Sequence, residues 1–137
     1  MGPEEESLAK AKQYKTEIHA FMLSFRYDFK SDKFCPTKIS FRPRQDASSD
    51  WKLEVPSSFQ FIGSNDRVCS EDSDWTVLGR VKDGKVQSQD EILTCEVDSA
   101  EPFSFRKYRC LGIKVLAVQL PTKDVTSLDD VRMWVRL

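Results

Sequence analysis

Apolar and polar side chains alternate with a period of two along much of this chain. Within residues 18–29 every odd position from 21 onward is apolar or aromatic, namely Phe21, Leu23, Phe25, Tyr27 and Phe29. Successive side chains of a β-strand point to opposite faces, so this alternation indicates a strand with one buried face. It predicts one strand of unusual length here, or two strands joined by a bend.

Further stretches with strand character follow at short intervals. They are "PTKISFRPR", "SFQFIG", "WTVLGR", "EILTCEV", "YRCLGIKVLAVQL" and "VRMWVRL". In the first, Ile39 and Phe41 alternate with Lys38, Ser40 and Arg42; in the last, Val131, Met133 and Val135 alternate with Arg132, Trp134 and Arg136. Phe59 and Phe61 should likewise point inward. The stretch "YRCLGIKVLAVQL" is apolar on both faces, which predicts a strand in the middle of a sheet.

Many short strands with frequent turn signals predict an antiparallel β-sandwich. The pair Asp83-Gly84 predicts a hairpin turn. One segment, "PEEESLAKAKQYK", has helical character, because its acids come first and its lysines follow, as the helix dipole favours. We therefore expect an N-terminal tail or short helix over residues 1–16 and a sandwich domain over residues 17–137.

Charge and hydropathy narrow the range of partners. The 137 residues carry a net charge of -1, so no basic excess indicates nucleic acid. The longest apolar run, "LGIKVLAVQL", is too short to span a bilayer, and we expect no membrane insertion. The start "MGPEEESLAK" lacks the order of a secretory signal, so an intracellular protein and a mature or trimmed form both stay open.

Four cysteines offer two readings. Cys35, Cys69, Cys95 and Cys110 include no CxxC unit, and with the single histidine, His19, they assemble no zinc spacing. Their even number permits two disulfides in three pairings. In a reducing compartment the same residues would be small buried apolar side chains.

The order of several motifs resembles the discoidin, or coagulation factor 5/8 C-type, family. The motifs are "YDFKSDKFCPTKISFRPR", "PSSFQFIGSND", "DSDWTVL" and "FRKYRCLGIKV", which together span about Arg26 to Val115. This resemblance implies a jelly-roll β-sandwich of the galactose-binding type that binds ligands through loops at one end. The "A-F-D-G"-like turn that helps several members bind calcium is absent here, so that site is not carried over.

The loop "RPRQDASSDW" holds the best local set of sugar-binding side chains. Arginine supplies a rigid fork of donors and tryptophan a flat apolar face. The set of candidate ligand-binding residues is Arg42, Arg44, Gln45, Asp46 and Trp51. The alternative is that the arginines form surface ion pairs and that the tryptophan fills the core.

An acidic loop follows the strand "SFQFIG". It offers oxygen ligands for calcium in Ser64, Asn65, Asp66, Glu71, Asp72 and Asp74, but their spacing does not support a calcium loop, and we expect no cofactor. A structural role is favoured: Gly63 and Asn65 would adopt backbone angles that other residues resist, Asp66 would cap turn amides, and Trp75 would fill the core. The resemblance implies that Arg109 braces the sandwich.

The sequence favours recognition without catalysis. It contains no phosphate loop, nucleophile elbow or HExxH motif, and its lone histidine suits a strand face. The prediction is a non-catalytic module that binds a glycan or glycoprotein, or mediates cell adhesion. The family resemblance implies an extracellular or cell-surface location. The alternative is a protein–protein interaction module that binds no sugar.

Overall fold

Strands dominate the computed structural model, which describes residues 5–11, 14–17, 25–98, 105–119 and 125–136. A single helical turn, α1 (Trp51–Glu54), is the one helix of that part of the chain. The strands are β1 (Glu5–Ala11), β2 (Tyr14–Glu17), β3 (Phe25–Asp28), β4 (Cys35–Arg42), β5 (Pro56–Ser64), β6 (Thr76–Val81), β7 (Leu93–Glu96), β8 (Cys110–Val118) and β9 (Val125–Arg136).

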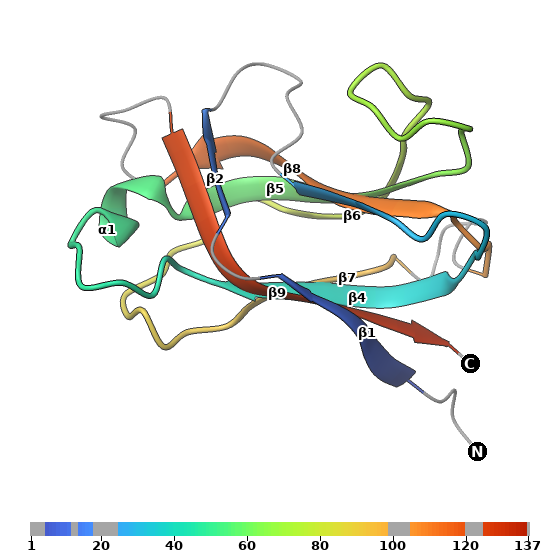
Figure 1. Cartoon of the computed structure of the whole chain (residues 1–137). Helices are drawn as coiled ribbons and strands as arrows, with labels where there is room; N and C mark the ends of the chain where they lie inside the picture. The colour runs from blue at the N-terminus through green and yellow to red at the C-terminus, as the bar shows by residue number, and fades with distance from the viewer. Residues whose placement is uncertain (1–4, 12–13, 18–24, 99–104, 120–124, 137) are drawn as a thin grey trace.

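The strands form two antiparallel sheets that lie as two layers (Figure 1). The five-stranded sheet has the order β1-β9-β4-β7, and β2 also pairs with β9. The four-stranded sheet has the order β3-β8-β5-β6. One apolar core takes side chains from both sheets. The expected all-β sandwich is confirmed at this level.

The period-two pattern predicted the core correctly in several strands. Ile39 and Phe41 of β4 are fully buried, as are Phe61 of β5 and Met133 of β9. Phe41 and Phe59 meet edge to face across the two sheets, with their ring centroids 5.0 Å apart. Such aromatic pairs add to the stability that burial alone provides. The polar residues between these positions therefore lie on the outer faces.

The prediction that "YRCLGIKVLAVQL" is a central strand is confirmed, because β8 lies between β3 and β5. Its inward positions, Leu111, Ile113 and Val115, are buried. Its other face is less covered than the sequence suggested, since Leu116 is 50% exposed. A sandwich covers only one face of each sheet, and this explains the difference.

The N-terminal helix was a wrong prediction. Residues 5–11 and 14–17 are strands, and both pair with β9 (Figure 1). Glu5 lies opposite Arg136 and Ala11 opposite Val131. A short helix with few apolar positions gains little from packing, whereas β9 offers its backbone along twelve residues. β2 also crosses the boundary expected between residues 16 and 17.

The long strand expected over residues 18–29 is described only from Phe25 onward. His19, Phe21 and Leu23 lie outside the described residues. Within β3, Phe25 is 6% exposed but Tyr27 is 41% exposed, so the expected common buried face is wrong at Tyr27. β3 is an edge strand of its sheet. There the Tyr27 ring packs on that of Phe29 instead, with centroids 5.0 Å apart.

The hairpin expected at Asp83-Gly84 is also absent, because β6 and β7 belong to different sheets. The segment between them crosses from one layer to the other. Its turn chemistry is nevertheless present. Asp83 has a positive φ of 53°, and the backbone N–H of Gly84 donates to the Ser57 carbonyl at 2.7 Å. A turn signal marks a change of direction without stating which strand comes next.

Candidate functional site

The loop expected to bind sugar is occupied by contacts within the protein. Arg44 donates from Nε to Asp46 at 2.6 Å and contacts Glu54 at 3.4 Å. The hydrogen bond to Asp46 raises the pKa of the Arg44 guanidinium. The Gln45 side chain donates to the carbonyls of Pro43 and Gln89, at 2.8 and 2.7 Å. These polar groups hold the loop in place.

Trp51 begins α1 and is only 7% exposed. It packs with Val55 and Val86 in a small apolar cluster beside the main core. It therefore offers no open aromatic platform. Of the five candidate ligand-binding residues, Arg42 lines a surface hollow on the five-stranded sheet.

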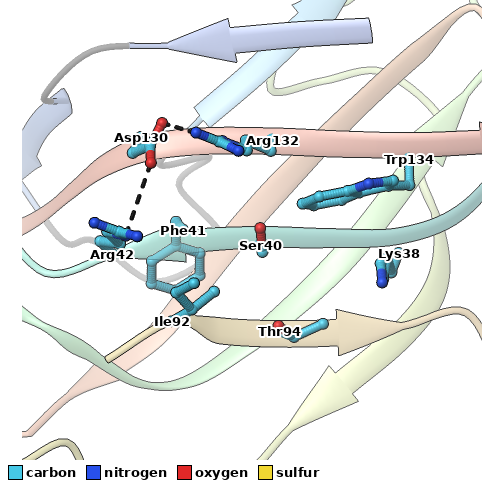
Figure 2. A pocket seen from close by; sticks show the side chains of 9 residues that line it. All are labelled: Lys38, Ser40, Phe41, Arg42, Ile92, Thr94, Asp130, Arg132 and Trp134. Atoms are coloured by element: carbon cyan, nitrogen blue, oxygen red, sulfur yellow. Dashed lines mark hydrogen bonds and ion pairs between the residues drawn. The ribbon is translucent and has the colours of Figure 1, made fainter. Parts of the chain in front are cut away.

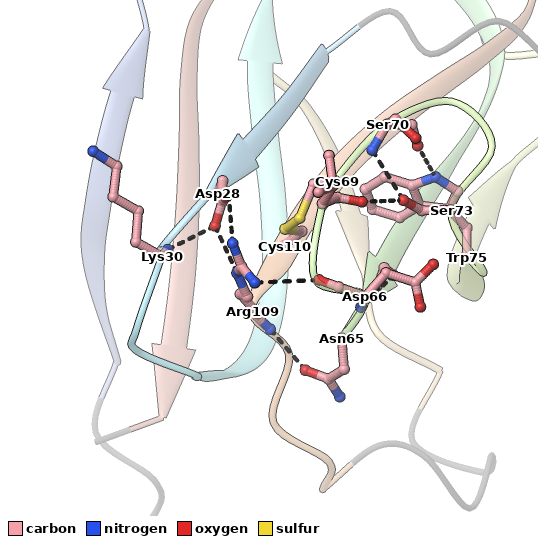
Figure 3. Close-up of a disulfide and its surroundings, with 12 residues drawn as sticks. Asp28, Lys30, Asn65, Asp66, Cys69, Ser70, Ser73, Trp75, Arg109 and Cys110 are labelled. Atoms are coloured by element: carbon pink, nitrogen blue, oxygen red, sulfur yellow. Dashed lines mark hydrogen bonds and ion pairs between the residues drawn. A yellow bond between two sulfur atoms is a disulfide. The ribbon is translucent and has the colours of Figure 1, made fainter.

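The acidic loop after β5 is held by side-chain hydrogen bonds (Figure 3). Asn65 donates to the Lys107 carbonyl at 3.0 Å and accepts from the Arg109 backbone N–H at 2.9 Å. The Asp66 carboxylate accepts the Asp74 backbone N–H at 2.7 Å, which is the amide-capping contact expected of it. The Asn65 bonds tie the loop to the residues just before β8, and the Asp66 bond holds the loop internally.

The structural roles expected of Gly63, Asn65 and Trp75 in this loop differ from those observed. Gly63 and Asn65 have no positive φ, since Lys30, Asp83 and Asp130 are the described non-glycine residues with that conformation. Glycine is needed at 63 for space, because a Cβ there would lie 2.9 Å from the Tyr108 ring.

Trp75 does not fill the core as expected. It is half-buried and lies outside the core cluster. Its indole N–H donates to the Ser70 carbonyl at 2.8 Å, and this contact closes the loop on itself (Figure 3).

Arg109 donates two hydrogen bonds of 3.1 Å each to the Asp28 carboxylate, from Nε and from a terminal nitrogen. The same guanidinium reaches the Asp66 carbonyl at 3.5 Å. The hydrogen bond with Arg109 holds the pKa of Asp28 below its ordinary value. Arg109 thus links β3 to the acidic loop.

One disulfide joins Cys69 of the acidic loop to Cys110 of β8, with Cα atoms 6.3 Å apart. Cys35 and Cys95 are buried thiols, and burial raises the pKa of both, that of Cys95 to about 11. The protein therefore has one of the two disulfides that the even number of cysteines permits, while the other two cysteines are small buried side chains. The sulfur atoms of Cys69 and Cys110 lie near the Asp28 carboxylate. Because these sulfurs are bonded to each other, they offer no thiolate to a metal.

A hollow of about 350 Å³ lies on the outer face of the five-stranded sheet (Figure 2). We call it the sheet groove. It is lined by Lys38, Ser40, Phe41, Arg42, Ile92, Thr94, Asp130, Arg132 and Trp134. β4 runs along its middle, with β9 on one side and β7 on the other. In the strand register Ser40 lies between Arg132 and Thr94.

A β-bulge shapes one end of the sheet groove. Between Ser40 and Arg42 the register shifts, so that two steps on β4 match three on β9, from Asp129 to Arg132. Asp130 adopts a positive φ of 50° there. Its carboxylate accepts from Arg132 Nε at 3.3 Å and lies 3.8 Å from Arg42 Nε. Bulges of this kind re-aim side chains, and here one carboxylate stands between two guanidinium groups.

Trp134 forms the other end of the sheet groove. The Lys38 ammonium lies 4.9 Å from the centroid of its ring, a cation–π contact. Ile92 adds an apolar side chain that is 57% exposed. The groove therefore combines an indole, two hydroxyls, three cations and one carboxylate on a surface of paired strands.

The sequence contains a signal for this groove in the outward positions of two strands. Lys38, Ser40 and Arg42 alternate with buried residues of β4, and Arg132 and Trp134 do the same in β9. Trp134 is half-buried on the outer face of β9, and an aromatic side chain on an outer face can offer its ring to a ligand. What the sequence did not contain was the pairing of β4 with β9.

No protein-family model matches this chain, and no curated protein matches it in sequence. Solved structures with a similar fold include a SusE-like protein. The superposition has a TM-score of 0.63 and 12% sequence identity, and it covers 98% of this chain and 68% of that chain. At this identity the likeness concerns the fold alone. Among the described residues, no helix has the length and apolar character to cross a membrane.

Proposed function

We propose that this protein is a non-catalytic recognition module that binds a glycan in the sheet groove. The observation that carries the proposal is the presence of an indole, guanidinium groups and hydroxyls in one hollow of about 350 Å³. Hollows of this size suit small ligands. The groove replaces the loop of residues 42–51 as the proposed site.

The chemistry of the groove suits a sugar. A pyranose has an apolar C–H face, which packs on an aromatic ring, and a rim of hydroxyls. Arg42 and Arg132 present fixed forks of donors, and Thr94 offers a hydroxyl that both donates and accepts. Three neighbouring strands carry these groups, and such a rigid surface loses little entropy on binding.

The disulfide supports an extracellular or cell-surface location, since such bonds persist in oxidising environments. The jelly-roll connectivity and the discoidin-like family that the motifs suggest stay predictions. So does the division between residues 16 and 17. The similarity to a SusE-like protein is one of fold and adds no ligand to the proposal.

A glycan array probed with the full chain, followed by calorimetry on its hits, tests the proposal. Trp134→Ala should weaken binding by about tenfold or more, because a central aromatic contact is lost. The fold should persist, since Trp134 lies on the outer face of the sheet. Equal melting temperatures of the variant and the unchanged protein would verify this.

Lys52→Ala is the matched control. Lys52 also lies over an indole, 5.7 Å from the Trp51 ring centroid, but on α1 and outside the groove. Its removal should leave binding unchanged. Failure of every glycan to bind, or equal binding by Trp134→Ala, would contradict the proposal. Capture of a protein partner without any sugar would favour the interaction-module alternative.

A further inference from the structure

The sheet groove carries an excess of positive charge. Its lining includes three cations, Lys38, Arg42 and Arg132, against one carboxylate, Asp130. The chain as a whole has a net charge of -1, so this excess is local. Glu96 lies opposite Lys38 in the strand register, at the end of the groove, but does not line the hollow. A neutral ligand would make no use of this charge.

The two arginines retain donors for a ligand. Both approach Asp130 through Nε, at 3.8 Å from Arg42 and 3.3 Å from Arg132. Arg42 Nε is buried and has no hydrogen-bond partner within the described part of the chain. One carboxylate therefore satisfies the two guanidinium groups only in part. Because both groups face Asp130 through Nε, a second anion at this end would accept from their terminal nitrogens, and such charge-assisted bonds are the stronger ones.

The Lys38 ammonium lies on the indole that a sugar ring would use. A neutral ring would have to displace this cation and would form no ion pair with it. An acidic sugar would form an ion pair with the displaced ammonium. Lys38 and Arg42 are four residues apart on β4, about 13 Å along an extended strand. The groove thus has a cationic aromatic end and a guanidinium end, which more than one sugar unit could reach.

From these observations we infer that the preferred ligand is an acidic oligosaccharide, with an anionic substituent held by Arg42 and Arg132 and a ring packed on Trp134. This inference rests on the proposed glycan binding and adds the chemical class of the ligand. Carboxylate and sulfate substituents share the required chemistry. The experiment below separates these two sources.

Matched probes differ only in charge. An oligogalacturonate is compared with its methyl ester, and a sulfated dextran oligosaccharide with unmodified dextran, by calorimetry on the full chain. The acidic member of at least one pair should bind about tenfold tighter, since it alone forms charge-assisted hydrogen bonds. This preference should shrink as salt is raised from 50 to 500 mM, because salt screens charges at an open surface. The pair that shows the preference identifies the substituent.

Arg132→Gln is the diagnostic variant and Arg80→Gln its matched control. Arg80 is an exposed arginine of β6, in the opposite sheet. Arg132→Gln should reduce the preference for the acidic probe to about threefold or less, while Arg80→Gln should leave it intact. Equal losses in both variants would indicate non-specific attraction and would overturn the inference.

Two further results have distinct meanings. Equal binding of the acidic and neutral probes would overturn the acidic preference and leave glycan recognition standing. Absence of binding by all four probes and by the glycan array would overturn both the inference and the proposed function.

Discussion

The ion pair between Asp28 and Arg109 should make the stability of this protein depend on pH in the acid range. Because the folded state lowers the pKa of Asp28 below its ordinary 3.8, the ionised carboxylate stabilises the fold above that pH. The contribution disappears as the pH falls through the lower folded pKa. Asp28→Asn should therefore reduce the melting temperature by a few degrees at pH 6 and by much less at pH 2.5.

Asp32→Asn is the control for this pH series. Asp32 is an exposed acid in the same turn region, after β3. Its substitution should leave the melting temperature unchanged at both pH values. A deficit in Asp28→Asn that is equally large at pH 6 and pH 2.5 would show that the charge is not the cause.

Single side chains differ in how far the sequence determines their roles. Alternation identified buried positions such as Phe41 and Met133, because burial follows from the strand period alone. The roles of polar residues depended on distant partners. Gln45 was expected at a sugar site, yet it bonds to the carbonyl of Gln89, 44 residues away. Trp51 was also expected at the sugar site, yet it packs against Val86, which lies far along the sequence.

The disulfide between the acidic loop and β8 should make a large contribution to stability. It closes a loop with a sequence separation of 41, for which chain entropy suggests about 4 kcal/mol. Urea unfolding with and without reductant should show a fall of this order in the free energy of unfolding. Thiol counting on unfolded, unreduced protein should give two thiols, from Cys35 and Cys95.

The double variant Cys69→Ser/Cys110→Ser isolates the bridge in that experiment. Its free energy of unfolding should be lower than that of the unchanged protein by a similar amount. Reductant should not change it further. A response as large as that of the unchanged protein would place the effect elsewhere. Loss of the bridge should also loosen the acidic loop, although the hydrogen bond that Asn65 donates and the one that Asp66 accepts still hold it.

At the N-terminus the sequence correctly indicated an element of secondary structure but gave the wrong type. Residues 5–11 have two acids before a lysine, a local preference for helix. β1 instead pairs with residues more than one hundred positions later. Local preference is a weak term, and many backbone hydrogen bonds to a long neighbour outweigh it. The sheet groove could not be predicted for the same reason, because it forms where β4 pairs with β9, and that pairing joins distant parts of the sequence.

β9 links the parts of this fold that lie farthest apart in the sequence. It pairs with β1, β2 and β4 (Figure 1), so that Glu5 lies opposite Arg136. Its inward side chains, Leu128, Val131, Met133 and Val135, are all fully buried. At about 1.5–3 kcal/mol each, four such side chains contribute about 6–12 kcal/mol, comparable with the whole stability of a domain, about 5–15 kcal/mol.

Deletion of residues 125–137 should therefore abolish folding rather than weaken it. The truncated chain should lose its cooperative thermal transition and the dispersion of its amide NMR signals. Deletion of residues 1–11 is the matched control, because it removes an edge strand of the same sheet and leaves the β4–β9 pairing in place. That variant should still melt cooperatively, at a lower temperature. A cooperative transition in the chain without β9 would mean that the four-stranded sheet holds a core of its own. That result would contradict the main core shared by both layers.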